Sequence, residues 1–210
     1  AGFACLAAAR NRKLAETGWD VEADGLFGAP PVRVIAGAHA HTTVFAALRM
    51  LGFGAGRTEI VEADDQGRML PGSLEKVLRS GEGPAIVIGQ AGEVNTGAID
   101  PLDAVADAVH EYGAWLHVDG AFGIWAAAVP SLAHLAEGLG DADSWTTDAH
   151  KWLNVPYDSG IVFCAHPESH RAAMTVQAAY LIQDEGSRRV RDEVDWVPEF
   201  SRRARGSVRR

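Results

Sequence analysis

The sequence has few cysteines and no long uninterrupted apolar run. Its two cysteines, Cys5 and Cys164, lie far apart and in no metal-binding spacing, which favours free buried thiols in a reducing compartment. No apolar run approaches the roughly 18–20 residues that a membrane-spanning helix needs. The apolar residues 1–10 follow no basic region and show no cleavage pattern, so they indicate a helix rather than a signal peptide. These observations predict a cytoplasmic protein with no membrane partner.

An excess of positive charge is also missing. The formal net charge is −9, which argues against a nucleic-acid-binding protein. Half of the arginines follow Gly186, and this basic tail is interpreted as a solvated segment rather than a nucleic-acid patch. A chain of 210 residues with 47% hydrophobic and 22% charged residues can bury one sizeable core.

What is present is a regular alternation of short apolar runs and helix-forming segments. The runs expected to be strands are 32–35, 59–62, 85–88, 115–118, 143–147 and 160–164. The segments expected to be helices are about 4–17, 42–51, 71–78 and 101–112. Thr42 or Thr43 is expected to cap one helix and Asp100 another. This alternation predicts an α/β fold of three layers, αβα, around a mostly parallel sheet.

Two residues at strand ends carry the strongest chemical signal. Asp119 ends one predicted strand, and Lys151 follows another in a His-Lys pair. In open α/β sheets, ligands bind at the carboxyl ends of the strands. This is the layout of a pyridoxal-phosphate (PLP) site, where the lysine amine forms a Schiff base and the aspartate keeps the pyridine nitrogen protonated. The alternative for Lys151 is an ordinary surface lysine. The alternatives for Asp119 are a helix cap or a metal ligand beside His117.

Several neighbouring residues could complete such a site. His39 and His41 form a His-x-His pair, which could bind a metal or place one imidazole on the cofactor ring, and His41 is the preferred stacking residue. His150 could contact the cofactor phosphate or act on the adjacent lysine. Ala121 follows Gly120, and both are small enough to let the ring approach the backbone, with the Ala121 methyl against one ring face.

With these residues in hand, the chain resembles the group II PLP-dependent amino-acid decarboxylases, which have the aspartate-aminotransferase-like fold (fold type I). The most specific segments are His-Val-Asp-Gly-Ala-Phe-Gly at 117–123 and Asp-Ser-Trp-Thr-Thr-Asp-Ala-His-Lys-Trp-Leu at 143–153. Residues 40–44 are similar to an Ala-His-Ser-Ser segment of that family. Residues 92–98 are similar to a turn that approaches the cofactor, and this similarity selects Asn95.

The resemblance implies a role for each of these residues. Lys151 would hold PLP as a Schiff base, and Asp119 would pair with the pyridinium nitrogen. His41 would cover one ring face, Ala121 would support the other, and His150 would lie near the phosphate. The implied reaction is the loss of the α-carboxylate of an amino-acid substrate as carbon dioxide, catalysed by a homodimer.

The chain also departs from the family pattern. A Ser-Gly-Gly phosphate-binding turn is expected just before residue 1, and a C-terminal domain after the Ser-Arg-Arg segment at 201–203, so the sequence is interpreted as a fragment. We expect a PLP-binding large domain over 1–186 and a basic segment over 187–210 that leads toward the missing domain. Asp148 stands where an asparagine is usual, and Glu193 aligns with a loop tyrosine that protonates the α-carbon.

Two other functions stay open on the sequence. The same electron sink serves aminotransferases and carbon–carbon lyases, because substrate orientation selects the bond that breaks. A truncated remnant that folds but catalyses nothing is the third hypothesis.

Overall fold

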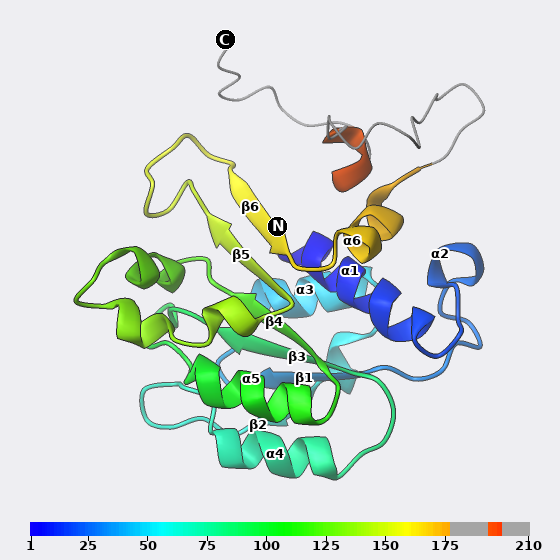
Figure 1. Ribbon diagram of the computed structural model, residues 1–210, viewed down its shortest axis with the longest axis horizontal. Helices are drawn as coiled ribbons and strands as arrows, with labels where there is room; N and C mark the ends of the chain where they lie inside the picture. The colour runs from blue at the N-terminus through cyan, green and yellow to red at the C-terminus, as the bar shows by residue number, and fades with distance from the viewer. Residues whose placement is uncertain (177–192, 199–210) are drawn as a thin grey trace.

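The structure is a computed structural model that describes residues 1–176 and 193–198. These residues form one six-stranded sheet with the strand order β2-β1-β3-β4-β5-β6 (Figure 1). The strands are β1 (Arg33–Gly37), β2 (Glu59–Val61), β3 (Ala85–Gln90), β4 (Trp115–Asp119), β5 (Ser144–Asp148) and β6 (Gly160–Cys164). All neighbouring pairs are parallel except β5 and β6, which are antiparallel. The predicted, mostly parallel sheet is therefore confirmed.

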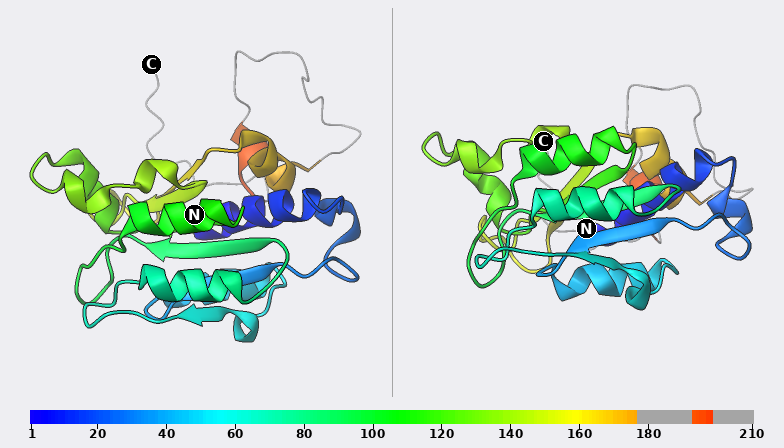
Figure 2. Two further views of the ribbon diagram at one scale, coloured as in Figure 1. Left: turned by 60° about the horizontal axis from the view of Figure 1, so that its bottom comes forward. Right: turned by 90° about the horizontal axis from the view of Figure 1, so that it is seen from below.

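Helices cover both faces of the sheet, which gives the three layers that the alternation predicts (Figure 2). The α-helices are α1 (Gly2–Ala15), α2 (Val21–Asp24), α3 (Thr42–Met50), α4 (Pro71–Arg79), α5 (Leu102–Glu111) and α6 (Pro167–Met174). Short 3₁₀ helices are η1 (Ala55–Arg57), η2 (Gly123–Ala128), η3 (Ala133–Ala136), η4 (Leu139–Asp141) and η5 (Glu193–Trp196). Helices α4 and α5 pack on one face, and α1 and α3 pack on the other.

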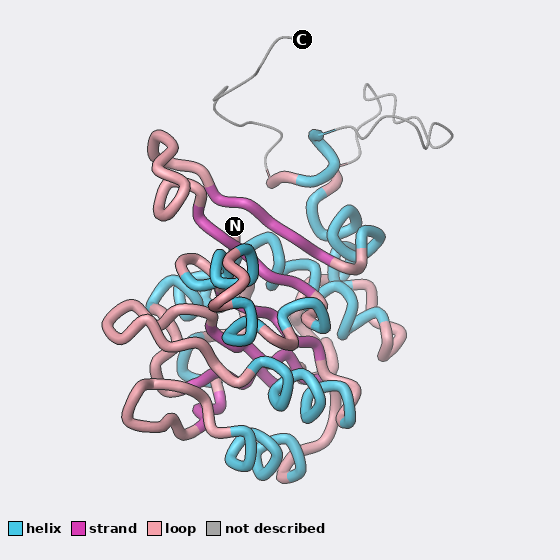
Figure 3. Tube along the Cα trace, turned by 60° about the vertical axis from the view of Figure 1, so that its left-hand side comes forward, coloured by secondary structure: helices cyan, strands magenta, loops and turns pink. Residues whose placement is uncertain are grey.

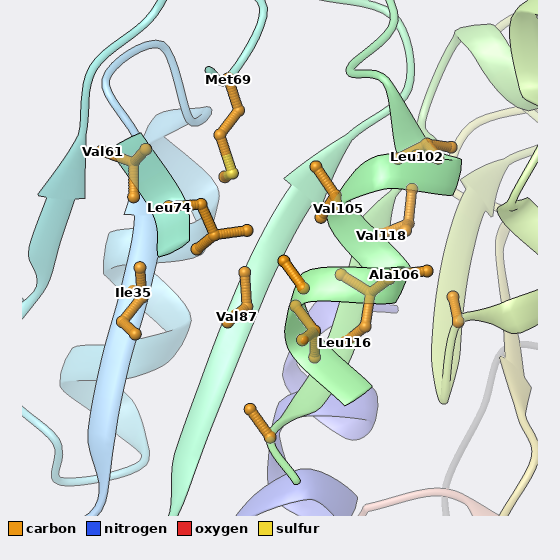
Figure 4. Close-up of a cluster of buried hydrophobic side chains, with 14 of the residues drawn as sticks. Ile35, Val61, Met69, Leu74, Val87, Leu102, Val105, Ala106, Leu116 and Val118 are labelled. Carbon is orange, nitrogen blue, oxygen red and sulfur yellow. The ribbon is translucent and has the colours of Figure 1, made fainter. Parts of the chain in front are cut away.

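The core lies in two parts, one on each side of the sheet. Along β1, Val34 and Ala36 pack toward α1 and α3, whereas Ile35 packs toward α4 and α5. Figure 4 shows the part of the core between the sheet and helices α4 and α5, where Leu74 of α4 and Val105 of α5 contact strand side chains. Because both faces of these strands are buried, their sequences are continuous apolar runs rather than alternating patterns.

Two helix caps differ from the predictions. The N-cap of α3 is His41, whose Nδ1 accepts a hydrogen bond from Thr43 N at 3.4 Å. Thr42 and Thr43 lie inside the helix. Asp100 does not cap α5, because its carboxylate accepts hydrogen bonds from Met69 N at 2.8 Å and Gln90 N at 2.7 Å. Burial raises the pKa of Asp100 to about 6.

A close approach between two strands fixes the position of the site. The N–H of Gly120, just past β4, donates to Thr146 O of β5 at 3.0 Å. A Cβ atom at Gly120 would lie 2.8 Å from that oxygen and closer still to Ile124. The absence of a side chain at Gly120 thus lets the end of β4 approach β5, which sets where Asp119 lies relative to β5.

The loop between β5 and β6 projects beyond the sheet (Figure 3). Of the predicted C-terminal segment 187–210, the structure describes only residues 193–198, so the boundary predicted at residue 186 lies outside the described residues. Glu193 begins η5, and Asp195 in that helix accepts a hydrogen bond from Arg171 Nε of α6 at 2.9 Å. Within the described part of the chain, no helix is both long and apolar enough to cross a bilayer.

Candidate active site

A cleft of about 530 Å³ opens at the carboxyl edge of the sheet. Its volume lies within the roughly 300–1,000 Å³ that is typical of small-molecule sites. The start of α1, one side of α3 along its length, and the ends of β3, β4 and β5 contribute to its lining. Most of the residues selected from the sequence meet here: Lys151, Asp119, His41, His150 and Ala121.

Asp119 is the last residue of β4. Its Oδ1 accepts a hydrogen bond from Ala121 N at 3.2 Å, so the backbone of the following turn holds the carboxylate. In the parallel register Asp119 lies opposite Thr146 of β5, which also lines the cleft. The end of β4 therefore supplies a carboxylate to the cleft.

His117 lies on the same side of β4 as Asp119, because side chains two residues apart in a strand share a face. Its ring is buried, and Nδ1 lies 3.0 Å from Ser144 Oγ. Burial lowers the pKa of His117 to about 4, which makes the imidazole neutral near pH 7. Among the described residues, no group of three or more His, Cys, Asp or Glu side chains is placed to hold a metal ion. The metal-ligand alternative for Asp119 and His117 thus gains no support.

Lys151 lies just past β5, in the loop toward β6. Its Nζ is 2.9 Å from Asp148 Oδ2 and 4.1 Å from the centroid of the Phe122 ring. The lysine side chain is 27% exposed, so the amine is accessible from the cleft although it is partly enclosed. The ammonium therefore lies between a carboxylate on one side and the face of an aromatic ring on another.

His150 is tied to the same loop. Ser159 N donates to His150 Nδ1 at 2.9 Å, and the ring packs against Tyr157 with centroids 4.1 Å apart. Ser159 O also lies 3.0 Å from Nδ1, so the backbone of Ser159 holds this edge of the ring. The other ring nitrogen, Nε2, lies 3.9 Å from Asp148 Oδ2.

His41 lies at the start of α3. Its Nδ1 lies 2.8 Å from Thr43 Oγ1, and the ring caps the first turn of the helix. His41 and Thr43 both line the cleft. His41 therefore caps helix α3 and also lines the cleft.

Asn95 and His39 are not among the residues that line the cleft. The side-chain amide of Asn95 donates to Glu93 Oε1 at 2.8 Å, and its backbone N–H donates to Glu93 Oε2 at 2.6 Å. Burial opposes the ionised form of Glu93, but hydrogen bonds from Thr96 and Asn95 outweigh it and lower the pKa of this carboxyl. From the same turn, Val94 lines the cleft instead.

Some lining residues carried no predicted role. Phe122 follows Ala121 directly, so its position in the turn after β4 could have been predicted from the sequence. Tyr157 reaches the cleft only because the loop after β5 folds back, which no local pattern reveals. Ala1, Gly2 and Phe3 bring the first turn of α1 to the cleft, where the backbone N–H groups and the helix dipole favour an anion.

Comparison with known proteins agrees with this geometry. The family model described as "Pyridoxal-dependent decarboxylase conserved domain" matches residues 1–208. Mouse cysteine sulfinic acid decarboxylase is 36% identical over 138 residues, covering 64% of this chain and 28% of that protein. Aromatic-L-amino-acid decarboxylase of Bacillus atrophaeus is 33% identical over 172 residues, covering 79% of this chain and 35% of that protein.

The same likeness extends to solved structures. The structure of Oryza sativa TDC with PLP and tryptamine has a TM-score of 0.81 at 27% identity, covering 92% of this chain and 40% of that chain. The structure of mouse CSAD in apo form has a TM-score of 0.77 at 27% identity, covering 87% of this chain and 39% of that chain. This chain spans only about a third of the length of such relatives. The match over nearly all of the sequence, with the fold and the cleft described above, places the chain in the pyridoxal-dependent decarboxylase family.

Proposed function

We propose that this chain is part of a PLP-dependent decarboxylase that removes the α-carboxylate of an amino acid. The observation that carries the proposal is the presence of Lys151 and Asp119 in one cleft at the carboxyl edge of the sheet. The named relatives act on different amino acids, so the proposal extends to amino acids as a class.

The chemistry of the cleft fits the cofactor. PLP carries an aldehyde, a basic ring nitrogen and a phosphate, and the cleft offers a different partner to each. Lys151 supplies an amine, Asp119 a carboxylate, and the first turn of α1 an environment that favours an anion. The volume of about 530 Å³ leaves room for an amino acid beside the ring.

Each residue has its own task in this proposal. Lys151 would hold the cofactor through its amine. Asp119 would stabilise a proton on the ring nitrogen, and His41 and Ala121 would cover the two ring faces. His150 would hold the phosphate. Asn95 stays a prediction that the lining of the cleft does not support, because its side chain bonds to Glu93.

When bound, PLP supplies the electron sink that stabilises negative charge at the substrate α-carbon. The protein selects the bond that breaks by orienting the substrate. The residues that line the cleft therefore determine the reaction together with Lys151. His117, two residues before Asp119 on the same strand face, is neutral near pH 7 because burial lowers its pKa to about 4.

We further propose that the protein works as a homodimer in the cytoplasm. Large apolar side chains lie exposed around the loop after β5, including Trp152 at 70% and Tyr157 at 76%, and such patches mark association surfaces. The cysteines Cys5 and Cys164 are free thiols, which supports a reducing compartment.

Spectroscopy and product analysis test the proposal. Added PLP should give a visible absorption band with the protein, and Lys151→Ala should remove it. A carboxyl-labelled amino acid should then release labelled carbon dioxide. A band without carbon dioxide, together with an oxo-acid product, would instead indicate transamination.

A further inference from the structure

The ion pair between Lys151 and Asp148 occupies the amine that the proposed function needs. Nζ and Oδ2 lie 2.9 Å apart, and the two side chains are only 27% and 24% exposed. The Phe122 ring, 4.1 Å from Nζ, encloses the ammonium on another side. An amine held as an ammonium in this ion pair has no lone pair with which to attack an electrophile.

The carboxylate is held in place for this contact. Asp148 is the last residue of β5 and pairs in register with Gly160 of β6. A Cβ atom at Gly160 would lie 3.3 Å from Asp148 Oδ1, so the glycine leaves room for the carboxylate. On the other oxygen, Oδ2, His150 Nε2 approaches to 3.9 Å. The aspartate is therefore positioned by the strand, whereas Lys151 sits in a loop.

We propose that Asp148 is a positioning residue that masks the Lys151 amine and so slows its reaction with a carbonyl compound that enters the cleft. Attachment of an aldehyde forms a carbon–nitrogen bond and releases the carbonyl oxygen as water. The reaction begins from the neutral amine, so the ammonium first loses its proton to solvent and its contact with Asp148. Asp148 thus slows capture of the cofactor and protects the lysine from other electrophiles. The part about the cofactor rests on the proposed function, whereas the masking of the amine does not.

Competitive acetylation measures the masking without any cofactor. The chain contains three lysines, Lys13, Lys76 and Lys151, and the exposed Lys76 on α4 serves as an internal reference. The protein is treated briefly with acetic anhydride, and peptide mass spectrometry gives the acetylation rate of Lys151 relative to Lys76. In Asp148→Asn this ratio should rise about three- to tenfold, because the amine loses its ion-pair partner and a partly exposed ion pair contributes only modestly.

Two variants control the comparison. Asp141→Asn removes the same charge from an exposed position in η4 and should leave the ratio unchanged. Asp148→Glu keeps a carboxylate at the same place and should restore much of the protection. If Asp148→Asn and the wild type give the same ratio while both are folded by circular dichroism, the proposal is wrong.

Capture of an aldehyde then tests the link to the cofactor. Pyridoxal, which lacks the phosphate, should form its visible band several-fold faster with Asp148→Asn than with the wild type. The absence of a phosphate ensures that the gain does not come from relieving repulsion between two anions. Faster acetylation without any band in either protein would support the masking and contradict the proposed function. Faster acetylation with equal band formation would overturn the claim that Asp148 controls capture.

Discussion

The imidazole Nδ1 of His117 lies 3.0 Å from the hydroxyl oxygen of Ser144, in a buried position between β4 and β5. Trp115 Nε1 donates to the same oxygen at 3.0 Å, so a single hydroxyl joins two strands and two rings. This polar cluster lies on the strand face that ends at Asp119. It holds the two strands whose ends carry the proposed catalytic groups.

Replacing Ser144 by Ala should lower the free energy of unfolding by about 2 kcal/mol, because it leaves buried polar atoms of Trp115 and His117 without their partner. Denaturant unfolding measures the change. Thr147→Val is the matched control on the same strand, since Thr147 Oγ1 is buried with no hydrogen-bond partner among the described residues. This control should be neutral or stabilising. An equal loss in both variants would mean that the Ser144 contacts contribute nothing specific.

The stability of the protein should depend on the titration of His117. Its folded pKa of about 4 lies below the ordinary 6.5, so the unfolded chain binds a proton more readily between these values. The contribution of the neutral, buried His117 to the free energy of unfolding is complete above pH 6.5. It is lost as the pH falls toward 4, by up to about 3 kcal/mol.

The comparison with His117→Gln isolates this effect. Asp100 acts in the opposite direction, since its raised pKa of about 6 favours folding at low pH, but both proteins contain it. The difference in unfolding free energy between the wild type and His117→Gln should therefore shrink or reverse as the pH falls from 6.5 to 4. A constant difference would show that His117 is not a buried neutral base.

A Gly120→Ala substitution should push the end of β4 away from β5. The added Cβ would lie 2.8 Å from the backbone oxygen of Thr146, which does not give way as a flexible side chain would. We expect a loss of at least about 2 kcal/mol in unfolding free energy and weaker PLP binding, because Asp119 moves with the strand end. Gly140→Ala is the control, as its Cβ would meet nothing within 4 Å. PLP binding unchanged by Gly120→Ala would contradict the link to Asp119.

Two substitutions at His41 separate its structural contact from its proposed contact with the ring. His41→Ala removes the N-cap of α3 and should cost about 1 kcal/mol of stability. His41→Asn retains a good capping side chain, so stability should be kept. Both variants should shift the absorption of bound PLP and weaken its binding, as measured by titration. Normal PLP binding by His41→Asn would assign this residue to the helix cap alone.

The strands and the edge of the sheet could be predicted because their signals are local. Apolar runs such as 85–88 mark strands buried on both faces, and a parallel sheet puts their carboxyl ends together. That reasoning was enough to place Asp119 and Lys151 in one cleft. It was also enough to find six strands, including the short β6 at residues 160–164.

The differences arise where the residue types alone do not fix which partner a polar group binds. Asp100 precedes a helix and has the right chemistry for a cap, yet backbone N–H groups of Met69 and Gln90 bind it. Asn95 bonds to Glu93 within its own turn, and this local contact keeps its amide from the cleft. The pairing of Lys151 with Asp148 depends on how the loop leaves β5, which the residue types alone do not specify.

Mapping the site of covalent PLP attachment tests the central claim most directly. The protein is incubated with PLP, reduced with borohydride to fix the linkage, digested, and analysed by peptide mass spectrometry. The proposed function predicts that the cofactor mass is on Lys151, with Lys13 and Lys76 unmodified. Attachment at those two lysines with Lys151 left intact would contradict the assignment of this cleft as the cofactor site.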